Sequence, residues 1–406
     1  MQRRKNMNIL LQKELDKIAT LFDITEYQMH QISNVFYEDM ENKTMLKMIP
    51  TYTYCNVDIP NGEYLAIDFG GTNVRCYKYG VKGKEIKILD KACFSLITEE
   101  KNYTTNEYTL EDIMNVIIDK LETIIDKDKE YFLGHTFSFA SKSLSKKNAI
   151  LIDMAKGFDL RETKNVDVNE LLIKVIKERK LKIEPTSIIN DTTATLLTGN
   201  YKNKNADIAM IVGTGHNACF KNKMGEIINI ESAYMSKGIP LSYYDFNLLD
   251  KLPGAKNTIL EILVGGKYLG LIAEEILNEL FEIGMIERKF EITSKMLTEA
   301  MENNLSDDYS NEEKEILNKI AEIILKRAAK LVVCEIMAII KYIDGDLEKE
   351  HCIVFDGTVY EKNKTLQDNI KVYLEKIYGE NAKKLETLLI KDASSVGAII
   401  SIFPLN

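Results

Sequence analysis

The stretch YLAIDFGGTNVR, residues 64–75, predicts how this chain builds its fold. Four mostly apolar residues run into Asp68, Gly70 and Gly71 follow, and a second strand-like run, VRCYKYGV, starts at residue 74. The pattern predicts a strand, a tight hairpin and a strand. Because glycine has no Cβ, Gly70 and Gly71 can take positive φ and let backbone N–H groups approach a phosphate closely.

Polar side chains around this hairpin suit the same ligand. Thr72 and Asn73 add donors beside the glycines, and Asp68 at the strand end is placed to hold a hydrated Mg²⁺ between phosphates. Short motifs of this kind also occur in ordinary glycine hairpins that bind nothing. Taken alone, the stretch leaves both interpretations open.

A second hairpin repeats the pattern later in the chain. In IAMIVGTGHNACF, residues 208–220, an apolar strand leads into Gly213, Thr214 and Gly215, and a second strand follows. Two phosphate-type hairpins in one chain indicate two related lobes that face one nucleotide. His216 follows the last glycine; contact with phosphate is one option, but a packed or solvated histidine is the simpler interpretation.

Three predicted strands end in a carboxylate. Asp68 ends YLAID, Asp191 ends SIIND and Asp356 ends CIVFD. In open α/β sheets ligands gather beyond the carboxyl ends of strands, so these three side chains are expected to converge on one cleft. A turn or helix-capping role is the alternative for each of them singly.

Hydrophobic periodicity extends the two hairpins into two α/β units. The first runs β-β-β-α-β up to YFLGHTFSF (residues 131–139), and three short strands begin again at residue 206. Capping boxes at Thr25–Gln28 and Ser310–Glu313 predict helix starts, the second of a helix reaching about residue 340. The segment between Pro50 and Pro60 is expected to be an extended connector. The prediction is a duplicated α/β protein whose lobes join near residue 190.

Composition narrows the class of protein. The 406 residues are 45% apolar and 28% charged, with a net charge of −9 and no basic stripe, so nucleic acid is not expected as a partner. The six scattered cysteines predict packed, reduced thiols. Neither a signal peptide nor a run of about 20 apolar residues is present, which favours a cytoplasmic protein that does not enter a membrane.

The segment between the two hairpins carries groups suited to a polyhydroxylated substrate. GHTFSFASKS (134–143), AKGFDL (155–160) and IINDTTATLL (188–197) concentrate a serine, a lysine, an amide and a carboxylate. Transfer of a phosphoryl group to a hydroxyl needs a carboxylate to accept the proton, and Asp191 is the natural candidate. The alternatives are that Ser138 caps a turn, that Asn190 and Asp191 cap a helix, and that Lys156 is a surface charge.

The combination resembles the eukaryotic-type hexokinase family over nearly the whole chain. The matching pieces occur in the family's order and are KMIPTY (47–52), LAIDFGGTNVR, TFSF, KGFD, INDTTATLL, IVGTGHNACF, NIES, PG followed by ILVGGKYLG, KRAAKLVVCEIMAII and FDGTVYEKN. The resemblance implies the actin-like (ribonuclease H-like) two-lobe α/β fold with a duplicated β-β-β-α-β-α unit and a central cleft. We expect a small lobe of residues 56–189 with the C-terminal helix 394–406, and a large lobe of residues 1–55 and 190–393.

The resemblance also implies an activity, which is transfer of the γ-phosphate of ATP to the 6-hydroxyl of glucose or a related hexose, with Asp191 as general base and Mg²⁺ on the phosphates, reached through water by Asp68 and Asp191. The sugar hydroxyls would be held by Ser138, Lys156, Asn190, Asp191, Asn217, Glu231 and Glu261, with Lys156 also assigned to catalysis. The nucleotide would be held by Asp68, Gly70, Gly71, Thr72, Asn73, Arg75, Gly213, Thr214, Gly215, Asp356, Gly357 and Thr358.

This sequence departs from the family pattern at several places. Ala155 replaces a threonine before the sugar-binding lysine, Ala140 replaces a proline, and two extra residues precede Glu261. In KDASSVGA (391–398) Ala393 and Ser395 replace glycines and Val396 replaces a lysine. A Cβ is expected to clash where glycine was needed for positive φ or for close approach to the base, so a phosphate donor other than ATP is an alternative.

Two other function classes remain open at this point. A sugar-binding sensor would keep the cleft without transferring phosphate, and an actin-like ATPase or chaperone would hydrolyse ATP without sugar. The bacterial glucokinase type with a structural zinc is not expected, because no Cys/His cluster has ligand spacing. A monomer and a homodimer are both compatible with the sequence.

Overall fold

The computed structural model describes residues 2–154 and 157–404. The glycine hairpin at 70–72 joins two central strands of a five-stranded sheet, ordered β4-β3-β2-β5-β8. Strand β3 runs antiparallel to both of its neighbours, β2 and β4, whereas β5 and β8 run parallel to β2. The strands are β2 (Gly62–Phe69), β3 (Asn73–Lys82), β4 (Glu85–Ser95), β5 (Tyr131–Phe137) and β8 (Ile183–Ile189).

The second hairpin builds a six-stranded sheet, ordered β1-β11-β10-β9-β12-β13. Its strands are β1 (Ile49–Tyr54), β9 (Ala206–Val212), β10 (His216–Lys221), β11 (Glu226–Asn229), β12 (His351–Asp356) and β13 (Leu385–Leu389). The predicted connector at 50–60 is therefore partly wrong, because its first residues pair with β11 as an edge strand. Pro50 is tolerated there since an edge strand leaves one row of N–H groups unpaired.

The predicted helix starts are confirmed. Thr25 and Ser310 form capping boxes at the starts of α2 and α10. The helices are α1 (Gln2–Phe22), α2 (Glu26–Asn42), α3 (Leu110–Leu121), α4 (Val168–Glu178), α5 (Asp191–Lys202), α6 (Tyr243–Lys251), α7 (Ile259–Val264), α8 (Gly266–Glu282), α9 (Ser294–Met301), α10 (Asn311–Ile343), α11 (Thr358–Lys362), α12 (Lys364–Tyr378) and α13 (Ala393–Ser401), and a small hairpin joins β6 (Ala140–Ser143) to β7 (Ala149–Asp153).

Side-chain alternation along the strands divides the core into three layers. On β2, Leu65 and Ile67 face a core shared with α3 and α4, whereas Tyr64 and Ala66 face the second sheet. The inner layer between the sheets contains α5 and α13. The third core lies on the far face of the six-stranded sheet, under α10.

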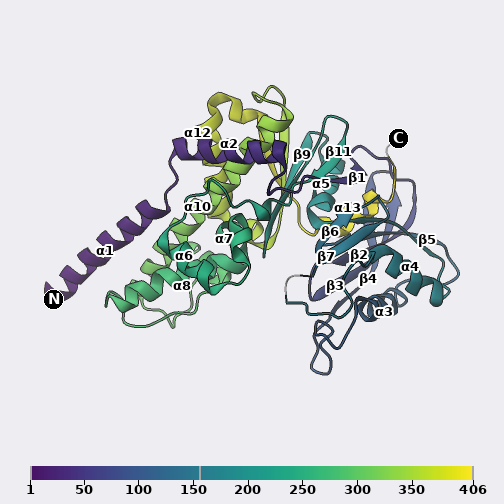
Figure 1. Cartoon of the computed structure of the whole chain (residues 1–406), viewed down its shortest axis with the longest axis horizontal. Coiled ribbons are helices and arrows are strands. Elements are labelled where there is room, and N and C mark those ends of the chain that lie inside the picture. Colours follow the sequence, from purple (N-terminus) through teal and green to yellow (C-terminus); the bar gives the residue numbers. More distant parts are fainter. Residues whose placement is uncertain (1, 155–156, 405–406) are drawn as a thin grey trace.

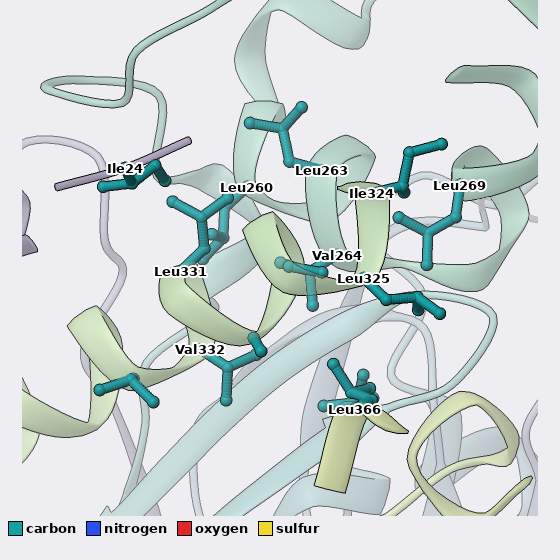
Figure 2. Close-up of a cluster of buried hydrophobic side chains, with 14 of the residues drawn as sticks. Ile24, Leu260, Leu263, Val264, Leu269, Ile324, Leu325, Leu331, Val332 and Leu366 are labelled. Carbon is teal, nitrogen blue, oxygen red and sulfur yellow. The ribbon is translucent and has the colours of Figure 1, made fainter. Parts of the chain in front are cut away.

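Helix α10 is the centre of this third core. Figure 2 shows Ile324, Leu325, Leu331 and Val332 pointing in different directions from one helix toward the surrounding elements. A helix buried on all sides is expected to be apolar all round, as the run from Leu331 to Ile340 is apart from Glu335, whereas Lys319, Glu322 and Lys326 give the earlier turns a polar face. Figure 1 shows α1 extending away from this helical part, on the side far from the five-stranded sheet.

The six cysteines are free thiols, and all except Cys93 are buried, in line with the prediction of packed, reduced cysteines. Among the helices of the described residues, none has the length and apolar character that crossing a membrane requires. The predicted terminal helix 394–406 is shorter in the structure, where α13 covers Ala393–Ser401. We propose that the lobe boundary follows the two sheets, with residues 56–189 and the C-terminal segment from residue 394 as the small lobe and residues 1–55 and 190–393 as the large lobe.

Candidate active site

Three strand-end carboxylates face the space between the two sheets. Asp68 continues the inward alternation of Tyr64 and Ala66 on β2, and Asp356 continues that of Val354 on β12. Asp191 is the first residue of α5, which lies between the sheets. The structure therefore brings together the three carboxylates that the sequence placed at strand ends.

The charges of these carboxylates affect one another's pKa values, as expected for side chains that lie close together. Burial raises the pKa of Asp68 above its usual value, Arg75 opposes this with an ion pair of 3.1 Å, and the charges of Asp191 and Asp392 add to the increase. Burial also raises the pKa of Asp356 to about 6, against hydrogen bonds from Gly357 and Ala393, and again Asp191 and Asp392 contribute. Negative charge thus accumulates around Asp191.

Sequence reasoning did not single out Asp392. It directly precedes α13 and adopts left-handed backbone with φ +52°. Its only signal in the sequence is its position in KDASSVGA, directly before one of the residues that replace glycines. The positive φ falls on Asp392, while Ala393 and Ser395 are helical and buried. Neither position therefore needs the positive φ of a glycine, and Ser395 shares a 2.7 Å hydrogen bond with the Tyr79 hydroxyl.

The first glycine hairpin leaves open space at its tip. Neither Gly70 nor Gly71 uses the positive φ that glycine allows, and the three-residue turn closes with ordinary backbone angles. A Cβ on Gly71 would find no atom within 4 Å, and one on Gly70 would lie 3.7 Å from Ser138 Oγ and 3.8 Å from Asp68 Oδ1. The glycines thus keep the surface between Ser138 and Thr72 bare.

The second glycine hairpin is held from behind by the start of α8. The amide of Gly266 donates to the Gly213 carbonyl at 2.7 Å, and the amide of Lys267 donates to the Thr214 carbonyl at 2.9 Å. Within the turn, the Gly213 amide donates to the Gly215 carbonyl at 3.0 Å. Sequence reasoning had used Gly266 as part of a motif but had not assigned it this support of the loop.

The turn after β12 packs directly against the second hairpin. Gly357 has φ +109°, and a Cβ there would stand 2.6 Å from the Val212 carbonyl carbon and 2.7 Å from the Gly213 nitrogen. Asp356 Oδ1 accepts from the Gly357 amide at 2.6 Å, and its Oδ2 accepts from the Ala393 amide at 3.3 Å. Thr358 then opens α11. Only glycine satisfies both the backbone angle and the contact at position 357.

The start of α5 places two polar side chains at the inner layer. Asn190 caps the helix, since its Oδ1 accepts from the Thr193 amide at 2.8 Å. Asp191 Oδ1 accepts from the Thr192 amide at 2.8 Å. The capping role foreseen for Asn190 is thus confirmed, and it fixes the orientation of an amide whose nitrogen is a further donor.

A chain of side-chain hydrogen bonds joins two other candidates. Asn217 Nδ2 donates to Asn229 Oδ1 at 2.9 Å, and Asn229 Nδ2 donates to Glu231 Oε1 at 2.6 Å. Glu231 has left-handed backbone, φ +56°, a conformation that functional sites often retain despite its cost. Asn229, which sequence reasoning had quoted within NIES but not assigned, is the link between them.

A narrow cavity connects these groups. Asn190, Glu231 and Asn229 line it together with Phe139 and Thr51, so that both sheets contribute to its walls. A larger cavity of about 600 Å³ lies elsewhere, between α1, α9 and the start of α10, and none of the candidate site residues lines it.

Two further sugar-binding candidates are Glu261 and Lys156. Glu261 lies at the second glycine hairpin, where its Oε2 accepts from the His216 amide at 3.4 Å, and a Cβ on Gly215 would be 2.6 Å from the same oxygen. Lys156, with its neighbour Ala155, lies outside the described residues. The remaining candidates lie at strand ends: Ser138 directly follows β5, and Asn73 and Arg75 lie at the start of β3.

The chain is similar in sequence to known proteins in both of its halves. Two family models, both described as Hexokinase, match residues 14–201 and residues 207–403. Hexokinase-1 of Schizosaccharomyces pombe is 26% identical, with 97% of this chain and 91% of that protein covered. Hexokinase-2 of Arabidopsis thaliana is 28% identical, with 89% and 82% covered.

A solved structure gives the same result for the fold. The hexokinase of Schistosoma mansoni, determined in complex with glucose, superposes with a TM-score of 0.81 at 22% identity over 96% of this chain and 98% of that one. The expected two-lobe, actin-like α/β fold is confirmed by this likeness. With both halves of the sequence and the whole fold in agreement, the chain belongs to the eukaryotic-type hexokinase family and is a hexokinase phosphotransferase.

Proposed function

We propose that this protein transfers the γ-phosphate of ATP to the 6-hydroxyl of glucose or a related hexose, with Asp191 as general base. One observation carries the proposal. Asp191 follows Asn190, which lines the cavity shared with Glu231, and its charge also acts on Asp68 and Asp356 beside the glycine hairpins. A base that serves both a sugar hydroxyl and a phosphoryl donor needs this intermediate position.

The orientation of Asp191 suits a base. The Thr192 amide holds its Oδ1, and the start of α5 offers partial positive charge that stabilises a carboxylate. A sugar hydroxyl that approaches Asp191 Oδ2 would give its proton to this carboxylate oxygen while the hydroxyl oxygen attacks the γ-phosphate.

The two glycine hairpins would hold the phosphates of the donor. In the first, Gly70 and Gly71 leave room for the phosphates, Thr72 and Asn73 add donors, and Arg75 orients Asp68. In the second, Gly213, Thr214 and Gly215 are fixed by α8. Asp356, Gly357 and Thr358 lie beside this hairpin and would face the nucleoside.

The residues present fit a divalent cation. Asp68, Asp191 and Asp356 are mutually repelling carboxylates, and two of them have raised pKa values, so a nearby cation would relieve their repulsion. In the described part of the chain no three Asp, Glu, His or Cys side chains are grouped as direct metal ligands. We therefore propose that Asp68 and Asp191 contact Mg²⁺ through water. When bound, Mg²⁺ would neutralise charge on the phosphates during transfer.

The sugar would lie at the cavity lined by Asn190, which has a volume of about 20 Å³ in this structure and would widen to admit a hexose. Oriented amides and carboxylates suit a polyhydroxylated ligand, because each buried hydroxyl left unpaired costs about 1–3 kcal/mol. The complex of the Schistosoma mansoni hexokinase with glucose supports a hexose as substrate. We assign hydroxyl binding to Ser138, Lys156, Asn190, Asp191, Asn217, Glu231 and Glu261.

Substrate-dependent turnover tests the proposal. Purified protein with Mg²⁺ is given ATP or another phosphate donor, with glucose, fructose, mannose, glucosamine or no sugar, beside Asp191→Asn and the surface control Asp250→Asn. We expect ATP consumption that requires a hexose, a loss of about 10²–10⁴-fold in kcat for Asp191→Asn, and no loss for the control. The product is identified as the 6-phosphate by NMR.

Other outcomes separate the alternatives. Sugar binding without use of any donor would make the protein a sensor. ATP hydrolysis that is indifferent to sugar would indicate an ATPase, and turnover only with a donor other than ATP would replace that part of the proposal.

A further inference from the structure

Behind the second glycine hairpin lies a buried pair that the proposed chemistry does not use. His216, the residue after Gly215, points its ring toward α10, and its Nε2 lies 2.6 Å from Glu335 Oε2. The two side chains are 0% and 1% exposed. The prediction that His216 is a packed histidine is confirmed, but its partner was not foreseen.

The hydrogen bonds define how many protons the pair holds. Nδ1 of His216 faces the Ile211 carbonyl oxygen at 3.1 Å, and a carbonyl only accepts, so Nδ1 carries a proton. A second proton is shared between Nε2 and Glu335. The pair is therefore neutral as a unit, and removal of either partner leaves the other buried without its counterpart.

A gain in stability alone does not explain why this pair is buried. Glu335 Oε1 has no hydrogen-bond partner among the residues that the structure describes, so one carboxylate oxygen is desolvated without compensation. Exchange of buried ion pairs for apolar residues of similar volume is often neutral or stabilising. A role in positioning explains better why a carboxylate stands at this point of an apolar helix.

The backbone of His216 shows what would be positioned. Its amide donates to Glu261 Oε2 at 3.4 Å, and Glu261 in turn lies against Gly215. The ring is anchored to α10 on one side, while the main chain touches both a candidate sugar ligand and the second hairpin. One residue thus connects the proposed sugar site with the proposed phosphate site.

We propose that the buried His216–Glu335 pair is a positioning device that fixes Gly213–Gly215 and Glu261 relative to each other, and so couples nucleotide binding to hexose binding. The inference rests on the proposed function. His216 and Glu335 are positioning residues, because neither side chain reaches the space between the sheets where the reaction would occur.

The test compares Glu335→Leu and Glu335→Gln with Glu322→Gln, an exposed carboxylate on the same helix that pairs with Lys319 and Lys326. For both Glu335 variants we expect KM for the nucleotide and Kd for the hexose to rise about tenfold to a hundredfold, since small misplacements have effects of this size. Hydrogen exchange of the amides at residues 213–217 should accelerate. Both Glu335 variants should also melt at a lower temperature, because His216 loses its buried partner, and Glu322→Gln should match the wild type throughout.

A purely structural role predicts the loss of stability without any loss of affinity. Glu335→Leu and Glu335→Gln would then lower the melting temperature while the folded fraction keeps wild-type KM, Kd and exchange rates, and this result would overturn the inference. If the wild type phosphorylates no hexose, the proposed function fails separately. The exchange rates at 213–217 and the calorimetric affinity for ATP then still decide whether Glu335 positions the hairpin.

Discussion

Gly397 of α13 lies against Ala194 of α5 at backbone distance, because a Cβ on Gly397 would stand 2.2 Å from the Ala194 carbonyl oxygen. The other side of α13 is equally close to the five-stranded sheet, where a Cβ on Gly134 would be 2.0 Å from the Ala398 carbonyl oxygen. The two helices between the sheets therefore cross without a side chain separating them. This crossing connects the sheet of the first hairpin with the helix that carries Asp191.

Replacement of Gly397 by alanine tests this packing. The new methyl group meets backbone that has no free space, so we expect Gly397→Ala to lower the free energy of unfolding by about 1–3 kcal/mol. Gly71→Ala is the matched control, since a Cβ there meets no atom within 4 Å and its φ is not positive. Chemical denaturation measures both. Equal stability of the two variants would show that the helices separate at little cost.

The turn at Gly357 offers a second test, aimed at function. Gly357→Ala introduces a Cβ 2.6 Å from Val212 and also strains a backbone with φ +109°. We expect the second hairpin to shift and KM for the nucleotide to rise about tenfold to a hundredfold, with the hexose KM less affected. Gly284→Ala, which has φ +74° and no atom near its Cβ, separates strain from contact. A Gly357→Ala enzyme with the wild-type KM would contradict the proposed role of this turn.

The raised pKa of Asp356 makes a prediction about stability and pH. Its pKa of about 6, against 3.8 for an ordinary aspartate, means that the folded state binds the proton more tightly than the unfolded state. This contribution to stability is complete below pH 3.8 and is lost as the pH rises through about 6. Asp356→Asn, which stays neutral, should therefore be more stable than the wild type by about 2–3 kcal/mol at pH 7.5 and nearly equal to it at pH 4.

Melting temperatures of apo protein across this pH range measure the effect. Asp250→Asn serves as the surface control and should show no pH-dependent gain. A stability difference for Asp356→Asn that is the same at both pH values would contradict the raised pKa.

Local sequence rules were sufficient for the elements and the order of the fold. Capping boxes at Thr25 and Ser310, and apolar runs that end at Asp68 and Asp356, are signals contained in a few neighbouring residues. The edge strand that begins at Ile49 was missed, because its partner β11 is far away in the sequence and nothing local announces the pairing.

The sequence predicted the part of the candidate site that is formed by side chains at strand ends. It did not predict the part that depends on the backbone conformation of the loops. The carboxylates converge as expected, but Gly70 and Gly71 do not use positive φ, and the residue that does at the last loop is Asp392. Contacts such as His216 with Glu335 depend on how a hairpin meets a helix over one hundred residues later. No motif in a single sequence contains that information.

His351 should give the protein a bell-shaped dependence of stability on pH. Its buried ring lies between Asp207, 2.7 Å from Nδ1, and Asp344, 3.1 Å from Nε2. Burial alone would lower the pKa of His351, but the hydrogen bonds and charges of the two aspartates outweigh it and raise the pKa above 6.5. The pKa of Asp344 is lowered, since hydrogen bonds from the Lys349 amide and from His351 outweigh its burial.

The signs of the two shifts define the pH window. The stabilisation from protonated His351 is fully present below pH 6.5 and is lost as the pH rises through the raised pKa. The part that comes from Asp344 is present above pH 3.8 and is lost as the pH falls through the lowered pKa. His351→Gln cannot become charged, so we expect it to lose about 3 kcal/mol relative to the wild type between pH 4 and 6.5, and less on either side. Denaturation at several pH values, with the exposed His30→Gln as control, measures the difference, and a pH-independent loss would show that His351 stays neutral.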